Sequence, residues 1–324
     1  MEADFSRYQS LKNWRSEQMF THQSSTDEFN CFHELIINKV FSLTIDDMVK
    51  EHGSLPSDFS WFVMGSTGRY EQAVNSDQDH GLVFENNDEY TNEYFLTFGK
   101  RLCVNLQFVG YPYCMGNVMS SNPLWCQSIE SWERQLDQWL LEESWESIRY
   151  LLIFYDARVV VGEASPIQKL KQRLHQFLHQ KPHLLNRFFD NTSYMKKGIG
   201  VFGQFLTESN GRYKDCLELK HTAFFPYVNS IRLLAIRENL EQTSTLSRID
   251  ALSKLPAYNR QLEPYADHFD KLLSYRLQYA DGYYLNVKKL NKIDKLGLKQ
   301  IILGGRDLQR YAETTVKRVL KNEI

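Results

Sequence analysis

The chain has 324 residues, enough for two domains that each bury a hydrophobic core. Its hydrophobic fraction of 42% and charged fraction of 24% are ordinary for a globular protein, and its net charge of −2 argues against a nucleic-acid partner. There is no apolar stretch of membrane-spanning length, no signal-peptide core in the first residues, and no Cys-x-x-Cys pair among the five cysteines. We therefore expect a cytoplasmic protein without disulfides, without a thiolate zinc site and without a membrane partner.

The first half of the chain alternates helix and strand signals. A helix is expected over residues 26–51, because Ser25 and Glu28 have the spacing of a capping box and apolar residues then recur at a helical period. The same kind of patterning predicts the elements that follow: a buried strand at 61–64, a short helix at 67–74, a strand at 82–84, a helix at 88–107 and a third strand within 108–119.

The second half is mostly helical. The segment 163–187 is polar, basic and interrupted by proline, which indicates a domain boundary near residue 165. Gly304-Gly305 predicts a turn before a last helix, whose apolar face would include Leu308, Ala312, Val316 and Leu320. The histidines at 175, 179 and 183 recur every four residues, but Pro182 interrupts them and we interpret them as a solvated polar face.

The most informative segment runs from Gly65 to Asp79. Gly65 lets backbone approach a ligand closely, and Ser66 opens a short helix whose free N–H groups suit phosphate. Arg69 lies one turn into that helix, within reach of a phosphate oxygen. Asp77 and Asp79 are one residue apart, so on a strand both carboxylates point to the same face.

Two crowded carboxylates repel one another unless a cation lies between them. Mg²⁺ suits this position, because it takes one or two carboxylates and fills its shell with phosphate oxygens and water. Asp-x-Asp alone is more often a solvated turn than a metal site. The whole pattern of apolar strand, Gly-Ser, short helix, Asp-x-Asp and second apolar strand favours a site for a nucleoside triphosphate and its metal ions.

The same residues carry a resemblance to a known family. The DNA polymerase β-type nucleotidyltransferase superfamily has a signature similar to Gly65-Ser66-x-Gly68-Arg69-x-Glu71-x-x-x-x-Ser76-Asp77-x-Asp79. The chain resembles, more narrowly, the N-terminal catalytic region of PII-protein uridylyltransferases and, closer still, the nucleotidyltransferase group DUF294. Further segments match that group: Cys114-x-Gly116-Asn117-Val118-Met119-x-x-Asn122-Pro123-x-Trp125, Asp156-x-Arg158-x-Val160-x-Gly162, Leu219-Lys220 and Ser244-Thr245-Leu246-x-Arg248.

The resemblance implies an α/β fold of polymerase β type. An N-terminal helical segment would occupy residues 1–57, a nucleotidyltransferase domain with a small mixed sheet and flanking helices residues 58–165, and a helical substrate-binding bundle residues 166–324. In the implied reaction, a hydroxyl group attacks the α-phosphorus of an NTP, either UTP or ATP, and pyrophosphate leaves. The acceptor would be a protein side chain, such as a tyrosine of a PII protein, or a small molecule.

The resemblance also assigns roles within the site. Asp77 and Asp79 would be the catalytic carboxylates that hold Mg²⁺, with Mn²⁺ as a substitute, and Gly65 and Ser66 would hold the triphosphate. Three more residues match the motifs. Arg69 would contact the nucleotide, Glu71 would pair with Arg69 or with nearby backbone, and Lys220 would either contact phosphate or base or bridge helices.

One feature departs from the superfamily pattern. Many polymerase β-type enzymes carry a third carboxylate on a later strand, but residues 109–119 have none, and Cys114 stands near the expected place. Asp156 is the nearest alternative, and we expect it to form a salt bridge with Arg158 or to cap a helix end. The missing general base favours a second hypothesis, a catalytically weak nucleotide sensor or regulatory module, whereas the intact Asp77/Asp79 pair argues against it.

Overall fold

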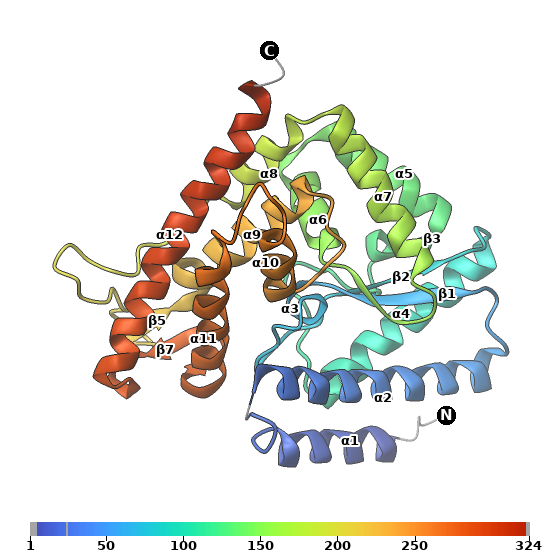
Figure 1. The fold of residues 1–324 in the computed structure, drawn as a ribbon. Helices are drawn as coiled ribbons and strands as arrows, with labels where there is room; N and C mark the ends of the chain where they lie inside the picture. The colour runs from blue at the N-terminus through green and yellow to red at the C-terminus, as the bar shows by residue number, and fades with distance from the viewer. Residues whose placement is uncertain (1–4, 24, 322–324) are drawn as a thin grey trace. The chain divides into compact units, whose positions relative to one another are not determined.

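The computed structural model describes residues 5–23 and 25–321, and these form two compact units. The first unit contains residues 1–142 and 153–174, and the second contains residues 143–152 and 175–324. The domain limits 1–57, 58–165 and 166–324 stay predictions, because compactness alone does not define a domain. Figure 1 shows an α/β first unit and a largely helical second one, which confirms the expected fold class.

The first unit is built from a four-stranded sheet and the helices that cover it. Its elements are α1 (Phe5–Gln18), α2 (Thr26–His52), β1 (Phe59–Val63), α3 (Gly65–Gly68), β2 (His80–Phe84), α4 (Glu89–Val109), the 3₁₀ turn η1 (Pro123–Trp125), β3 (Cys126–Ser128), α5 (Ile129–Glu142) and β4 (Arg158–Val161). Two further helices, α6 (Trp145–Tyr155) and α7 (Ser165–Gln180), have residues in both units.

The sheet has the strand order β3-β2-β1-β4 and is mixed. β1 pairs antiparallel with both β2 and β4, whereas β2 and β3 run parallel. Successive side chains of β1 alternate between the two faces. Trp61 stacks on Phe41 of α2 with ring centroids 4.7 Å apart, and Phe62 meets Trp132 of α5 at 5.7 Å. The sheet is therefore buried on both faces. Side chains that extend beyond the sheet are those at the ends of the strands.

Local capping explains the limits of the two long helices of this unit. The hydroxyl of Ser25 accepts a hydrogen bond from the backbone N–H of Glu28, which confirms the predicted start of α2. The side chain of Asp88 caps α4 in the same way. Gly110, with φ of +119°, ends α4 in a left-handed conformation that favours glycine.

Two expected elements of the first unit are wrong in kind or extent. The predicted strand within 108–119 is not a regular strand, because the segment after α4 forms only one isolated bridge, between Tyr113 and Gln78. The predicted helix from Thr67 to Val74 is replaced by the four-residue α3, which begins at Gly65. The helix ends at Gly68, and Tyr70 just beyond it has a φ of +57°, which a continuing helix does not allow.

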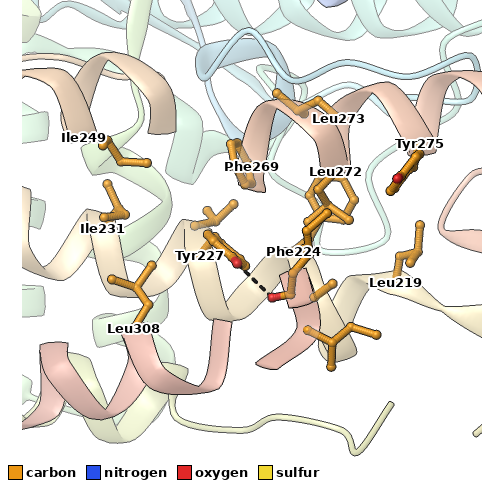
Figure 2. Packing of buried hydrophobic residues seen from close by; sticks show 14 of the residues in the cluster. Leu219, Phe224, Tyr227, Ile231, Ile249, Phe269, Leu272, Leu273, Tyr275 and Leu308 are labelled. Atoms are coloured by element: carbon orange, nitrogen blue, oxygen red, sulfur yellow. Dashed lines mark hydrogen bonds between the residues drawn. The ribbon is translucent and has the colours of Figure 1, made fainter. Parts of the chain in front are cut away.

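The second unit packs its helices around one hydrophobic core. Its elements are α8 (Leu184–Thr192), β5 (Cys216–Glu218), the π-helix η2 (Lys220–Phe224), α9 (Phe225–Arg237), α10 (Thr245–Ser253), α11 (Glu263–Tyr279), β6 (Ala280–Asp281), β7 (Tyr284–Asn286), the 3₁₀ turn η3 (Val287–Lys289) and α12 (Lys292–Lys321). Figure 2 shows Phe224, Ile231, Phe269 and Leu308 in this core. The small sheet β5-β7-β6 lies beside it in the same unit.

The predicted turn at Gly304-Gly305 is wrong, because α12 continues through both glycines. A Cβ atom on Gly304 would lie 2.7 Å from Nδ1 of His268, and one on Gly305 would lie 2.9 Å from the ring of Tyr227. The glycines therefore serve close packing, and the Tyr227 hydroxyl donates to the Ile301 carbonyl of α12 at 2.8 Å. The side chain of Leu320, expected on the same apolar face, lies outside the described residues.

Two expectations from composition can be compared with the structure directly. All five cysteines are free thiols. Among the helices of the described ranges, none combines the length and the apolar character needed to cross a membrane.

Candidate active site

The two carboxylates of the Asp-x-Asp motif converge just before β2. The backbone N–H of Met64, at the end of β1, donates to the carbonyl of Asp79 at 2.8 Å, so the two strand ends are held together. The chain is extended at Gln78, which forms a parallel bridge with Tyr113. Oxygen atoms of Asp77 and Asp79 and the Sγ atom of Cys114 all lie within 4.8 Å of one another.

Gln78 fixes the acidic pair from the opposite side. Its amide nitrogen donates to the carbonyls of Cys103 and Tyr111 at 3.1 and 3.0 Å, and its backbone N–H donates to Pro112 at 3.1 Å. Its amide oxygen lies 3.0 Å from Nε2 of His80, which must therefore carry the proton. These bonds tie the segment that carries Cys114 to the start of β2.

The thiol of Cys114 is a neutral group in this arrangement. Burial raises the pKa of Cys114 to about 12, and the Asp79 carboxylate acts in the same direction through its charge and a hydrogen bond. Burial also lowers the pKa of His80 to about 3, so its imidazole is neutral as well. Neither side chain adds a positive charge to the surroundings of the two carboxylates near neutral pH.

Gly65 brings the first turn of α3 against the acidic pair. Its φ is +55°, and a Cβ atom at this position would lie 2.0 Å from Oδ2 of Asp79. Only glycine allows this close approach. The turn is closed by bonds from the N–H groups of Gly68 and Arg69 to the carbonyls of Met64 and Gly65, whereas the N–H groups that open a helix have no acceptor within it.

Arg69 is engaged in a buried ion cluster. Its Nε atom lies 2.7 Å from a carboxylate oxygen of Glu71, and its Nη1 atom lies 2.7 Å from Asp156. The arginine side chain is 9% exposed, and that of Asp156 is fully buried. Burial alone would lower the pKa of Arg69, but the charges of Glu71 and Asp156 raise it. The expected pairing of Glu71 with Arg69 is present, and a phosphate would have to compete with two carboxylates for this guanidinium.

Asp156 has a different partner from the one expected. It pairs with Arg69, whereas Arg158 pairs with Glu34 at 2.9 Å and lies over the ring of Tyr70, 3.9 Å from its centroid. The carbonyl of Asp156 approaches Gly68 so closely that a Cβ atom there would be 2.3 Å away. Asp156 therefore holds the segment after α3 against the chain that leads into β4.

A small cavity lies behind the acidic pair. It is lined by both aspartates and by Trp61, Gln72 and His80, among others, and has a volume of about 10 Å³. In the described part of the chain, Nε1 of Trp61, Nε2 of Gln72 and Nδ1 of His80 find no hydrogen-bond partner. Two donors and one acceptor around a space of this size match one water molecule. The inner side of the site is thus suited to ordered solvent.

The remaining candidates lie apart from this cluster in the chain. Lys220 belongs to the second unit, where its ammonium lies 5.3 Å and 5.5 Å from the ring centroids of Phe225 and Tyr283. Its contact with a nucleotide stays a prediction. Of the three spaced histidines, His183 precedes α8 and pairs with Glu143. Across residues 5–23 and 25–321, the one group with metal-ligand spacing is Asp77, Asp79 and Cys114.

Sequence reasoning missed the part played by Gln78. In an extended chain, the side chain between two aspartates points to the opposite face from theirs. This position is the signal that would have indicated a buried polar side chain at Gln78. Cys114 was noted only as standing where a carboxylate was expected. The structure gives it a place beside both aspartates.

Comparison with protein families agrees with this geometry. Residues 11–146 match the family described as "Putative nucleotidyltransferase DUF294", and residues 182–316 match "Putative nucleotidyltransferase substrate binding domain". The two matches together span most of the chain, and the acidic pair lies within the first. No curated protein matches the chain. The narrower similarity to PII-protein uridylyltransferases stays a prediction.

Proposed function

Because the chain belongs to the DUF294 nucleotidyltransferase family, we propose that it transfers a nucleoside monophosphate from an NTP to a hydroxyl acceptor, with release of pyrophosphate. One observation carries the proposal: Asp77 and Asp79 converge beside the first turn of α3, where only glycine fits. In nucleotidyl transfer, carboxylates hold metal ions and backbone N–H groups bind phosphate, so this arrangement supports the proposal.

In this proposal Asp77 and Asp79 hold the divalent ion, and Gly65 and Ser66 hold the triphosphate through backbone N–H groups and a hydroxyl. Mg²⁺, or Mn²⁺ in its place, would neutralise negative charge on the phosphates when bound. The carboxylates suit this role because Mg²⁺ prefers oxygen ligands. A bound divalent cation would also relieve the repulsion between the two negative charges, so that no arginine or lysine is needed between them.

The other residues around the acidic pair act as its support. Gln78 and His80 hold the two aspartates against the segment of Cys114, and Arg69, Glu71 and Asp156 hold the turn that follows α3. We propose UTP or ATP as the donor and a protein side chain or small molecule as the acceptor. A PII-type protein tyrosine would fit the narrower resemblance, and the net charge of −2 disfavours nucleic acid.

The test is transfer of label from NTPs carrying a labelled α-phosphate, in the presence of cell lysate and Mg²⁺. Asp77→Asn combined with Asp79→Asn should lower the labelling rate by about 10²–10³-fold, as expected for the loss of groups that stabilise charge in the transition state. The matched control is Asp46→Asn, an exposed carboxylate on α2, which should leave the rate unchanged. Undiminished labelling by the double variant would refute the metal role of the pair.

A second function is favoured by one specific feature. The thiol of Cys114 lies beside the acidic pair, near the place where the resemblance implies a third carboxylate as general base. The chain would then bind a nucleotide and Mg²⁺ without rapid turnover, as a sensor or regulatory module. Tight NTP binding that depends on Asp77 and Asp79, with no pyrophosphate released for any acceptor in lysate, would support this function over transfer.

A further inference from the structure

We propose that Cys114 is a third protein ligand at the site of Asp77 and Asp79, so that the site binds thiophilic divalent ions through two carboxylates and one thiolate. The inference rests on the proposed function for the metal role of the two aspartates and adds to it the identity of a ligand and a selectivity. Ions of the Co²⁺, Zn²⁺ and Cd²⁺ class would bind through sulfur, whereas Mg²⁺ would use the carboxylates alone.

The first argument is geometric. The three ligand atoms lie within 4.8 Å of one another, a spacing that small rotamer changes convert to bonds of about 2.0–2.3 Å around one ion. They come from two separate segments, the residues just before β2 and the segment after α4. Asp79 also lies so close to Gly65 that a Cβ atom there would be 2.0 Å from its Oδ2 atom, which limits the room for its carboxylate.

The second argument is that the backbone holds Cys114 in this place. A turn follows it directly, because the N–H of Asn117 donates to the carbonyl of Cys114 at 2.9 Å and Asn117 has a φ of +54°. On either side, Pro112 and Val118 accept hydrogen bonds from the backbone N–H groups of Gln78 and His80, both at 3.1 Å. Met115 next to it is fully exposed, whereas Cys114 is partly buried against the aspartates.

The third argument is chemical. Thiolate ligands favour the softer divalent ions, whereas Mg²⁺ favours carboxylate, phosphate and water oxygens. When a soft ion binds, the S–H bond of Cys114 breaks, its proton passes to solvent and a sulfur–metal bond forms. Mg²⁺ has little affinity for sulfur, so it would bind the two carboxylates and solvent oxygens without displacing the thiol proton. The same two aspartates therefore serve both classes of ion.

The experiment is a titration of the full chain with Co²⁺ alone, followed by the near-ultraviolet charge-transfer absorption of a thiolate–cobalt bond. The wild-type chain should show the band, and Cys114→Ser should lose it, with a fall in Co²⁺ affinity of about tenfold or more, which equals about 1.4 kcal/mol. Cys31→Ser is the matched control, because Cys31 is an exposed thiol on α2, and it should keep band and affinity.

Mg²⁺ provides the second arm, as a competitor against bound Co²⁺. In Cys114→Ser the affinity for Mg²⁺ should stay within about twofold of wild type, because the carboxylates remain. Cys114→Asp restores a third oxygen ligand and should move the preference toward Mg²⁺. A merely structural cysteine would lower both affinities together, and circular dichroism of each variant identifies loss of fold.

The outcomes separate this inference from the proposed function. A charge-transfer band that survives in Cys114→Ser, or in the double variant Asp77→Asn and Asp79→Asn, would overturn the three-ligand site even if labelled transfer is found. A band that depends on all three residues, in a chain that transfers no label to any acceptor, would leave the ligand set in place and refute the transferase function.

Discussion

The first unit contains two clusters of charged residues, one around Arg69 and one around Asp77 and Asp79, and they are built in opposite ways. In the Arg69 cluster, one guanidinium lies between the carboxylates of Glu71 and Asp156, and all three side chains are nearly buried. In the acidic pair, the carboxylates of Asp77 and Asp79 meet a thiol, which brings no positive charge.

The difference lies in whether the countercharge is part of the chain. A buried charge is tolerated when its partner is part of the same chain, as in the Arg69 cluster. Two carboxylates at one spot are tolerated when water or a cation reaches them, and Asp77 and Asp79 are only partly covered. Under the proposed function, a divalent ion would supply the positive charge at the acidic pair, whereas the Arg69 cluster contains its own.

The largest effect is expected from removing the internal cation. Arg69→Met would leave two carboxylates buried without a counter-charge, and should lower the free energy of unfolding by about 3–5 kcal/mol. Denaturant unfolding measures this loss. As the control, Arg134→Met removes an exposed pair with Glu130, whose side chains are more than half exposed, and should change stability by less than about 1 kcal/mol. If both variants lowered the free energy of unfolding equally, the buried Arg69 cluster would contribute no more to stability than an exposed ion pair.

A smaller effect is expected at the turn that meets the acidic pair. Gly65→Ala places a methyl group 2.0 Å from the original position of the Asp79 carboxylate and strains a left-handed backbone, at a cost of about 1–3 kcal/mol. Gly282→Ala is a matched control, since Gly282 has a similar φ of +62° but nothing within 4 Å of an added Cβ. Both variants share the backbone strain, so the difference between them in unfolding free energy and in Co²⁺ affinity reports the crowding of Asp79.

The same two clusters show how far the sequence alone can lead. Asp77 and Asp79 are neighbours in sequence, so their convergence could be predicted from the period of an extended chain. Glu71 could also be predicted as a partner of Arg69, whereas Asp156 could not, because it lies 87 residues further along the chain. A phosphate contact was the natural expectation for an arginine one turn after Gly-Ser, and only the fold shows the buried carboxylate that occupies it.

Local signals also explain which elements were predictable. α2 and α4 have both periodicity and caps within their own sequence, and their limits follow from Ser25, Asp88 and Gly110. The segment after α4 has strand-like composition, but single backbone bonds to Gln78 and His80 decide its course. The sequence Gly304-Gly305 predicts a turn by itself, whereas packing against Tyr227 and His268 keeps this segment helical. Tertiary contacts override local preference in both places.

The smallest effect is expected for His33, a buried polar side chain that is neutral in the folded protein. Its Nδ1 atom lies 2.8 Å from the hydroxyl of Tyr111, and burial, helped by the charge of Arg15, lowers the pKa of His33 to about 3. The unfolded chain therefore binds one proton more between pH 6.5 and 3. The contribution of His33 to the free energy of unfolding is fully present above pH 6.5. It falls by about 1.4 kcal/mol for each pH unit as the pH is lowered through this window.

His33→Gln should lose less stability than wild type between pH 7 and 5.5, whereas the exposed His179→Gln should follow wild type. If the unfolding free energy of all three chains had the same pH dependence, His33 would be charged in the folded state. Buried charge in this unit would then be tolerated without the pairing seen at Arg69.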